Sequence, residues 1–281
     1  MYIRSVANIS PQDTFGKSRI PENVIKPVTN RLNCIEPNYL DFIDNKSIRR
    51  MSRIIKMGVA SGLKCLHDAE IEKPDAIITG TAYGCLEDTE VFLEKLIENN
   101  ESLLTPTSFI QSTHNTIGAQ IGLLLKCTNY NNTFVHKGHS FESALLDCLM
   151  LLKNNEAKNA LLGGIDELTD LSYHIISRFG FYKNNLNSEK DLPNQNSKGT
   201  IAGEGSSFFL VTNEEQLNSI YTVLRQSNIN TSNIKNLVDV INYSKNNNRH
   251  QNNKNNYNNS RNSNINNYSN GNTNLNKNYN L

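Results

Sequence analysis

The stretch that decides the fold is TFVHKGHSFESALLDCLMLLKNNEAKNALLGG, residues 133–164 of the 281-residue chain. Its first four residues favour a short strand. Residues 140–153 then carry apolar side chains around most of a helix, which predicts a buried helix. Residues 158–164 form an apolar run that ends in a Gly-Gly pair and predicts a buried strand. A strand, a helix and a strand in this order form a βαβ crossover, so the sheet should be at least partly parallel.

Apolar spacing outside this stretch predicts further elements of an α/β fold. Residues 47–67 have the spacing of a helix, and Ser47 suits its N-cap. Residues 75–80 predict a buried strand, residues 87–99 an amphipathic helix and residues 206–212 a further strand. The residues before the first helix are expected to be irregular.

The carboxyl-terminal tail differs in composition from the rest of the chain. About half of the residues from Asn242 to Leu281 are asparagine, and apolar residues occur there only singly. Such a segment buries too little apolar surface to offset the entropy of ordering it, so we expect it to be disordered. The fold must therefore come from residues 1–241, which are enough to build a core.

Charge and cysteine content exclude several classes of protein. The formal net charge is +1, which predicts no attraction to nucleic acid or to an anionic membrane. The first residues, MYIRSVANIS, do not resemble a signal peptide, and no apolar run is long enough to span a bilayer. We therefore expect a soluble, cytoplasmic protein. Its five cysteines contain no CxxC pair and predict neither a disulfide framework nor a zinc site, and no cofactor or metal is expected.

Four stretches together resemble the β-ketoacyl synthase family in order and spacing. They are ITGTAYGCLEDTEVFLEKL (78–96), PTSFIQSTHNTIGAQIGLLL (106–125), ALLGGIDE (160–167) and AGEGSSFFLVTNEE (202–215). The sequence is most similar to the divergent subgroup associated with aryl polyene and flexirubin-type pigment clusters. The resemblance implies a thiolase-like α/β fold, with a mainly parallel central sheet and helices on both of its faces.

The resemblance divides the chain into three parts. Residues 1–213 correspond to the amino-terminal half of a condensing domain, residues 214–241 to the start of a truncated second half, and residues 242–281 to the disordered tail. Five glycines of the first part are expected to be structural, because they allow close backbone approach or free φ angles: Gly80, Gly163, Gly164, Gly203 and Gly205.

The family places its nucleophilic cysteine in the turn between the central strand and a buried helix, where the helix amino terminus favours the thiolate. Counting back from Gly163 puts Gly138 at this position, and a shift of one residue puts His139 there. Neither is a cysteine. Ser140 suits the N-cap of the helix, and His139, Ser140 and Phe141 could line what remains of the acyl pocket.

The second catalytic element of the family is also missing. Condensing enzymes use two histidines and a lysine from their second half, and Asn242, Tyr243 and Ser244 stand where the first of these motifs is expected. The resemblance thus implies a non-catalytic subunit, similar in role to a chain-length factor, in a homodimer or in a heterodimer with an active ketosynthase that works with an acyl carrier protein. The family's dimer contacts map to Thr107, Phe109, His114 and Asn115.

Two alternatives remain open from the sequence. Residues 138–142, GHSFE, are one residue away from the G-x-S-x-G elbow of α/β-hydrolases, so Ser140 could serve an acyl hydrolase or transferase. That chemistry requires a later acid and histidine, and only His174 and His250 follow. The other alternative is an inactive, truncated remnant of a gene.

Overall fold

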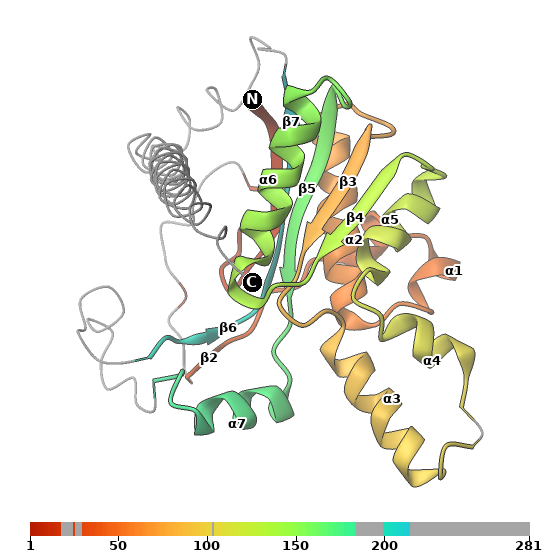
Figure 1. Ribbon diagram of the computed structural model, residues 1–281, viewed down its shortest axis with the longest axis vertical. Coiled ribbons are helices and arrows are strands. Elements are labelled where there is room, and N and C mark those ends of the chain that lie inside the picture. Colours follow the sequence, from red (N-terminus) through yellow and green to blue (C-terminus); the bar gives the residue numbers. More distant parts are fainter. Residues whose placement is uncertain (18–24, 26–29, 103, 184–198, 214–281) are drawn as a thin grey trace, which may run out of the picture. The chain divides into compact units, whose positions relative to one another are not determined.

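The computed structural model describes residues 1–17, 25, 30–102, 104–183 and 199–213 (Figure 1). The chain divides into two units, Met1–Ser227 and Asn228–Leu281, and the described residues belong to the first. The predictions for the truncated second half and the tail, residues 214–281, lie outside the described residues.

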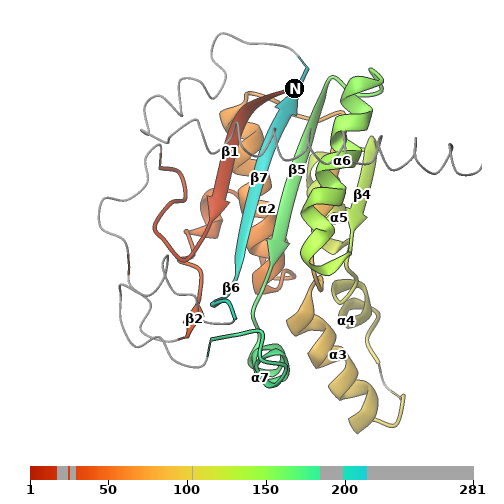
Figure 2. The same cartoon turned by 60° about the vertical axis from the view of Figure 1, so that its left-hand side comes forward.

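A five-stranded sheet forms the centre of the described unit (Figure 2). Its strands lie in the order β1 (Tyr2–Ile9), β7 (Gly205–Thr212), β5 (Asn159–Asp166), β3 (Ala76–Gly80) and β4 (Tyr130–Phe134). β3 is parallel to both β4 and β5, whereas β7 is antiparallel to both β5 and β1. Four of the five strands therefore run in one direction, which confirms the mainly parallel sheet.

Helices cover both faces of this sheet, as predicted. α6 (Ser140–Lys153) packs on β3, β4 and β5. On the opposite face, α2 (Arg53–Asp68) packs on β1, β7 and β5, and α5 (Thr116–Leu125) packs on β3 and β4. Figure 1 shows α6 in front of the strands and α2 and α5 behind them. The arrangement is the three-layer α/β/α half of a thiolase-like fold.

The remaining elements lie at the ends of the strands. They are β2 (Arg31–Leu32), α1 (Asn45–Ile48), α3 (Leu86–Glu98), α4 (Pro106–Gln111), α7 (Asp170–Arg178) and β6 (Ala202–Gly203), with short 3-10 turns at Tyr39–Asp41 and Lys137–His139. β2 and β6 form a separate parallel pair. None of the helices in the described ranges is long and apolar enough to cross a membrane.

Close packing explains three of the five predicted structural glycines. A Cβ at Gly163 would lie 2.2 Å from Cε1 of the buried Phe208 ring, and one at Gly80 would lie 2.7 Å from the Ser140 carbonyl oxygen. At Gly164 a Cβ would lie 3.0 Å from the Phe141 ring. At Gly203 and Gly205 a Cβ would make ordinary contacts, and neither has a left-handed φ, so the predicted need for φ freedom there is not found.

Several predicted boundaries were wrong. The amino terminus is strand β1 and not irregular, because β7 pairs with it along its length. The predicted helix over residues 47–67 is two helices, since Asp44 caps the short α1 and α2 begins only at Arg53. The first strand of the βαβ unit lies at Tyr130–Phe134, three residues before its predicted start, because the edge position tolerates its polar side chains.

The helix α6 has the predicted bounds, but its burial differs from the prediction. Its buried residues occupy one face, whereas Leu146 and Met150 on the opposite face are 52% and 54% exposed. α6 is therefore buried on its sheet side alone within the described part of the chain.

Candidate functional site

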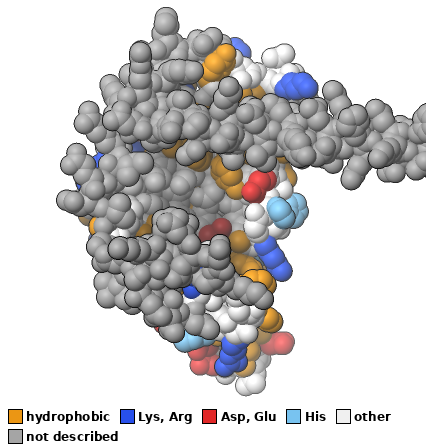
Figure 3. All heavy atoms as spheres, turned by 90° about the vertical axis from the view of Figure 1, so that its left-hand side faces the viewer, with side chains coloured by type: hydrophobic (Ala, Val, Ile, Leu, Met, Phe, Trp, Pro, Cys, Tyr) orange, Lys and Arg blue, Asp and Glu red, His pale blue; other side chains and the backbone are white. Residues whose placement is uncertain are grey.

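The turn where the sequence resemblance places the family's nucleophile connects β4 to α6. Lys137, Gly138 and His139 form a single 3-10 turn, and all three are exposed. A Cβ added at Gly138 would meet nothing within 4 Å, so the turn leaves open space there. On the side of the molecule seen in Figure 3, histidine, basic and acidic side chains lie next to hydrophobic ones.

Ser140 follows the turn as the first residue of α6 and is buried. Its Oγ donates a hydrogen bond to the Lys137 carbonyl (2.7 Å) and accepts one from the His136 backbone N–H (2.8 Å). The prediction that Ser140 is the N-cap was wrong: the 3-10 turn moves the cap to His139, whose side chain makes no capping bond. The neighbouring His136 ring contacts Ser143 in the first turn of α6, with His136 Nδ1 3.1 Å from Ser143 Oγ.

A cavity of about 400 Å³ opens beside this turn. It lies where the carboxyl ends of β3 and β5, the start of α6 and the β6–β7 connection converge. Its lining consists of Gly80, Ala82, Lys137, Gly138, Ser140, Phe141, Gly164, Ile165, Asp166, Gly203, Glu204 and Gly205. The structure thus brings the predicted pocket residues Ser140 and Phe141 together with Gly138 and four of the predicted glycines. The exposed His139 does not contribute to this lining.

Phe141 forms the apolar wall of the cavity. Its ring lies against Gly164, and its centroid is 5.9 Å from that of Phe209 on β7. Because a Cβ at position 164 would lie 3.0 Å from this ring, the phenyl group could keep its place against β5 only with glycine there or after a small shift.

Asp166 contributes a carboxylate to the cavity at the end of β5. Its Oδ1 accepts hydrogen bonds from the Thr81 hydroxyl (2.9 Å) and from the backbone N–H groups of Ala82 (2.7 Å) and Tyr83 (3.4 Å). Burial raises the pKa of Asp166 above its usual value, and these hydrogen bonds oppose the shift. The Asp166 carboxylate therefore holds the loop after β3, residues 81–83, against the end of β5.

Glu204 is the second carboxylate of the lining, and its side chain is 1% exposed. Arg53 on α2 binds it through two hydrogen bonds, Nη1–Oε2 at 2.8 Å and Nη2–Oε1 at 2.6 Å. The backbone N–H groups of Cys34 and Leu168 donate to the same carboxylate. Burial alone would raise the pKa of Glu204, but the bonds from Arg53 and the backbone hold it below its usual value.

Glu204 and Asp166 were not predicted as site residues. Both lie in stretches that carry the family resemblance, residues 160–167 and 202–215, but nothing local in the sequence shows that their carboxylates share one cavity. A buried acid needs a partner, and Arg53, which supplies it, lies 151 residues away along the chain.

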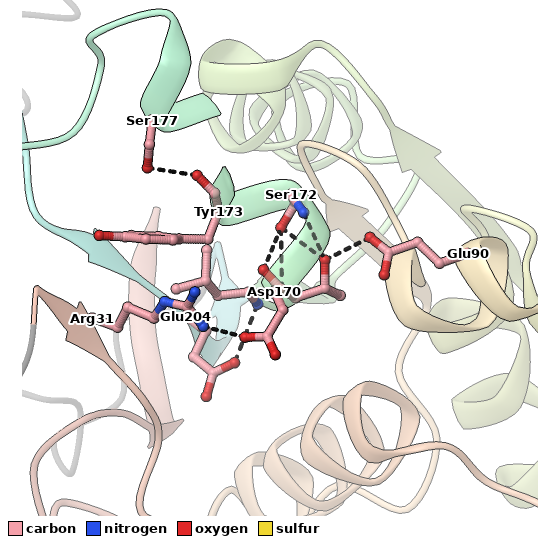
Figure 4. A network of polar contacts seen from close by, with 9 residues as sticks. Arg31, Glu90, Asp170, Ser172, Tyr173, Ser177 and Glu204 are labelled. Carbon is pink, nitrogen blue, oxygen red and sulfur yellow. Dashed lines mark hydrogen bonds and ion pairs between the residues drawn. The ribbon is translucent and has the colours of Figure 1, made fainter. Parts of the chain in front are cut away.

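A polar network secures α7 next to the cavity (Figure 4). The Arg31 guanidinium on β2 lies 3.9 Å from the centre of the Tyr173 ring and pairs with Asp170. The Thr169 hydroxyl accepts a bond from the Ser172 N–H at the start of α7 and donates one to Glu90 on α3 (2.6 Å). These contacts join α7 to β2 and α3.

Comparison with known proteins identifies this architecture. The family model for the β-ketoacyl synthase amino-terminal domain matches residues 29–180, more than half of the chain. The chain belongs to the β-ketoacyl synthase family. No curated protein sequence matches it.

Solved ketosynthase structures have the same fold at low sequence identity. A chain of the complex of the ketosynthase ApeO with its chain length factor ApeC from Xenorhabdus doucetiae matches with a TM-score of 0.55 and 18% identity, over 75% of this chain and 78% of that one. The ishigamide ketosynthase/chain length factor matches with a TM-score of 0.59 and 18% identity, over 80% of this chain and 59% of that one. A chain of the complex of a type II polyketide synthase acyl carrier protein with its ketosynthase, AntDE:AntF, matches with a TM-score of 0.58 and 15% identity, over 75% of this chain and 61% of that one. The chain thus spans about three fifths of two of these relatives.

The cysteines of this ketosynthase-family chain lie away from the nucleophile turn. Burial raises the pKa of the Cys34 and Cys148 thiols to about 12 and that of Cys65 to about 11, and it also raises the pKa of Cys85. A thiol with a raised pKa is a poor nucleophile at neutral pH, because the thiolate is the reactive form. Within the described ranges, no three His, Cys, Asp or Glu side chains group to hold a metal.

The residues predicted to make dimer contacts lie together in α4 and the connection to α5. Thr107, Phe109, His114 and Asn115 are all exposed, Phe109 by 57% of its surface. The Phe109 ring packs beside Phe92 of α3, with ring centroids 5.7 Å apart. These residues do not line the cavity, so the structure separates the predicted contact surface from the candidate pocket.

Proposed function

We propose that this chain is a non-catalytic ketosynthase-like subunit, similar in role to a chain-length factor, that pairs with an active ketosynthase in fatty-acid or polyketide-type synthesis. The observation that supports this proposal is the β4–α6 turn, which consists of Lys137, Gly138 and His139 and contains no thiol, at the place where the resemblance predicts the family's nucleophile. On this proposal the protein acts in the cytoplasm beside an acyl carrier protein.

The chemistry of condensation supports the loss of turnover. The growing acyl chain must be held as a covalent thioester while the second unit attacks it, and this requires an activated thiolate. Cys148, on the helix that follows the turn, lies more than two turns into α6 on its buried face. No described cysteine lines the cavity.

Ser140 does not offer a substitute nucleophile in this geometry. Its proton is donated to the Lys137 carbonyl, and the nearby His136 ring contacts Ser143. A serine without a base that accepts its proton is a weak nucleophile. The hydrolase alternative therefore has no observation in its favour.

Exposed apolar side chains support a partner at the α4 surface. Phe109 and Ile110 are each 57% exposed, and adjacent large apolar groups on a surface favour a protein contact. The structural relatives include a ketosynthase with its chain length factor and a ketosynthase with its acyl carrier protein, partners of the kinds proposed here.

Co-expression tests the pairing. The tagged full chain, expressed with a candidate active ketosynthase from the same genome, should recover that enzyme in a stoichiometric complex, and Phe109→Asp should abolish the recovery. Ile175→Asp, at an exposed apolar position on α7, is the matched control. Failure to recover any ketosynthase, together with aggregation of the chain on its own, would favour the inactive remnant.

A further inference from the structure

α3 and α4 together form an arm at the carboxyl ends of the strands. They pack on each other, with the rings of Phe92 and Phe109 5.7 Å apart, and Figures 1 and 2 show them side by side beyond the ends of β3 and β5. The arm carries Thr107 and Phe109, two of the residues predicted to contact a partner. The attachment of the arm to the sheet therefore sets the position of that surface.

The first turn of α3 attaches the arm to the segment after β5. The Glu87 backbone N–H donates a hydrogen bond to Oε1 of the buried Glu167 (2.9 Å), and Glu90 accepts one from the Thr169 hydroxyl (2.6 Å). Both contacts join α3 to the connection between β5 and α7. An acidic side chain is the acceptor in each contact, so the attachment depends on the charge of these groups.

Ionisation of Glu167 is unfavourable while α3 lies against it. Burial raises the pKa of Glu167 to about 7, the Glu87 N–H opposes this shift, and the negative charges of Glu87 and Asp88 add to it. Burial also raises the pKa of Asp88, which the Ser52 hydroxyl opposes. Two acidic side chains of α3 thus face a third across the contact.

The other titratable and charged groups around this contact come from the neighbouring elements. They are Cys85 before α3, Glu90 on α3, Asp166 on β5, Glu204 before β7 and Arg53 on α2. Arg53 is already bound to Glu204, which accepts the Leu168 N–H next to Glu167. Ionised Glu167 therefore has no counter-ion among the described residues.

Ordinary helix capping does not explain this arrangement. A carboxylate at the first turn of a helix is usually favoured in its ionised form, because the free N–H groups and the helix dipole attract negative charge. At Glu167 burial and two acidic neighbours outweigh that attraction.

We propose that Glu167 is a pH-sensitive anchor of the α3–α4 arm, which holds the first turn of α3 against the end of β5 when protonated and releases it when ionised. Opening of the contact exposes the carboxyl group to water and separates it from Asp88, so its pKa in the open form should be near 4.5. Between about pH 4.5 and 7 the closed form holds a proton that the open form has lost, so the closed form weakens as pH rises through this window. From pH 5 to pH 8 the equilibrium constant for opening should rise about thirtyfold.

Hydrogen exchange of the full chain at pH 5 and pH 8 tests this anchor, with rates corrected for the pH dependence of exchange in an unfolded peptide. Amides of α3 should be less protected than those of β3 at both pH values, because the arm opens without unfolding of the sheet. Their protection should fall about thirtyfold at the higher pH. Equal protection of α3 and β3 would show that α3 opens only when the whole unit unfolds, and would refute the proposal.

Two variants show whether Glu167 causes the change. Glu167→Gln keeps an oxygen that accepts the Glu87 N–H and should abolish the pH dependence of α3 protection, whereas Glu98→Gln, at an exposed position of α3, should keep it. Asp88→Asn removes one acidic neighbour and should lower the pH above which protection levels off, which a merely structural role for Asp88 does not predict. An unchanged pH dependence in Glu167→Gln would overturn the assignment.

This inference does not depend on the proposed pairing with a ketosynthase. Phe109→Asp should abolish recovery of the ketosynthase and keep the pH dependence of α3 protection, whereas Glu167→Gln should do the reverse. The two experiments can therefore fail separately.

Discussion

The Arg53 guanidinium and the Glu204 carboxylate are joined by two hydrogen bonds of 2.8 and 2.6 Å across 151 residues of sequence. The pair connects α2 to the turn before β7, and Glu204 also accepts backbone bonds from the segments after β2 and β5. One buried carboxylate thus fixes three chain segments at the cavity.

Removing the cation should destabilise this junction. Arg53→Met leaves the Glu204 carboxylate buried without its counter-ion, and we expect a loss of about 2–3 kcal/mol in the free energy of unfolding, less than for a fully buried pair because Arg53 is partly exposed. Urea unfolding measures the loss, and Arg49→Met, at an exposed position outside this pair, is the control. Equal stability of Arg53→Met and wild type would show that the pair contributes nothing.

Glu167 should make the stability of the protein depend on pH. Burial raises its pKa to about 7, while its Oε1 accepts the Glu87 N–H at the start of α3. Between about pH 4.5 and 7 the folded protein therefore holds a proton that the unfolded chain has released, so stability falls as pH rises through this window. Above pH 7 the folded state carries the full cost of the buried charge.

Glu167→Gln tests this dependence, since an amide oxygen can keep the hydrogen bond without the charge. The variant should be more stable than the wild type by about 2 kcal/mol at pH 8 and should show a smaller decrease in stability from pH 5 to pH 8. Chemical unfolding at both pH values gives the comparison, with Glu98→Gln at an exposed position of α3 as the control. Parallel pH profiles for Glu167→Gln and wild type would contradict the prediction.

Gly163 and Gly138 offer a matched pair of glycine substitutions. A methyl group at Gly163 would lie 2.2 Å from the buried Phe208 ring, whereas one at Gly138 would meet nothing within 4 Å. We expect Gly163→Ala to lower the free energy of unfolding by about 3 kcal/mol through overpacking, and Gly138→Ala to be neutral or slightly stabilising. Thermal melts of both variants check the contrast, and equal melting temperatures would mean that Phe208 moves without cost.

Sequence patterns predicted the parts of the fold that depend on local order. The apolar run over Ser140–Lys153 predicted the bounds of α6, and the apolar run over residues 158–164 predicted β5, which continues two residues past the Gly-Gly pair to Asp166. The strand β1 was missed because Ser5 and Ala7 occupy two of its buried positions, so its apolar alternation is weak, and because its partner β7 lies about 200 residues later.

The candidate site was predictable only where the family motif is continuous. Ser140 and Phe141 follow the nucleophile turn in sequence, and both line the cavity. Glu204 depends on Arg53, and the N-cap shift from Ser140 to His139 depends on a 3-10 turn that capping preferences do not reveal. Contacts between distant segments and the shape of a turn leave no periodic signal in the sequence.

The last prediction concerns covalent chemistry at the turn. Incubation of the wild type with an acyl thioester and an acyl carrier protein should give no stoichiometric adduct by intact mass, because the turn has no thiol and Ser140 donates its proton to a carbonyl. Gly138→Cys would place an exposed thiol immediately before α6, where the helix amino terminus lowers a thiol pKa. That variant should react with iodoacetamide and with the acyl thioester faster than any native cysteine, but should not condense the acyl group with a malonyl unit. An adduct on the wild type that disappears in Ser140→Ala would overturn the non-catalytic assignment, and an inert Gly138→Cys would show that the turn has lost the geometry of the family's nucleophile.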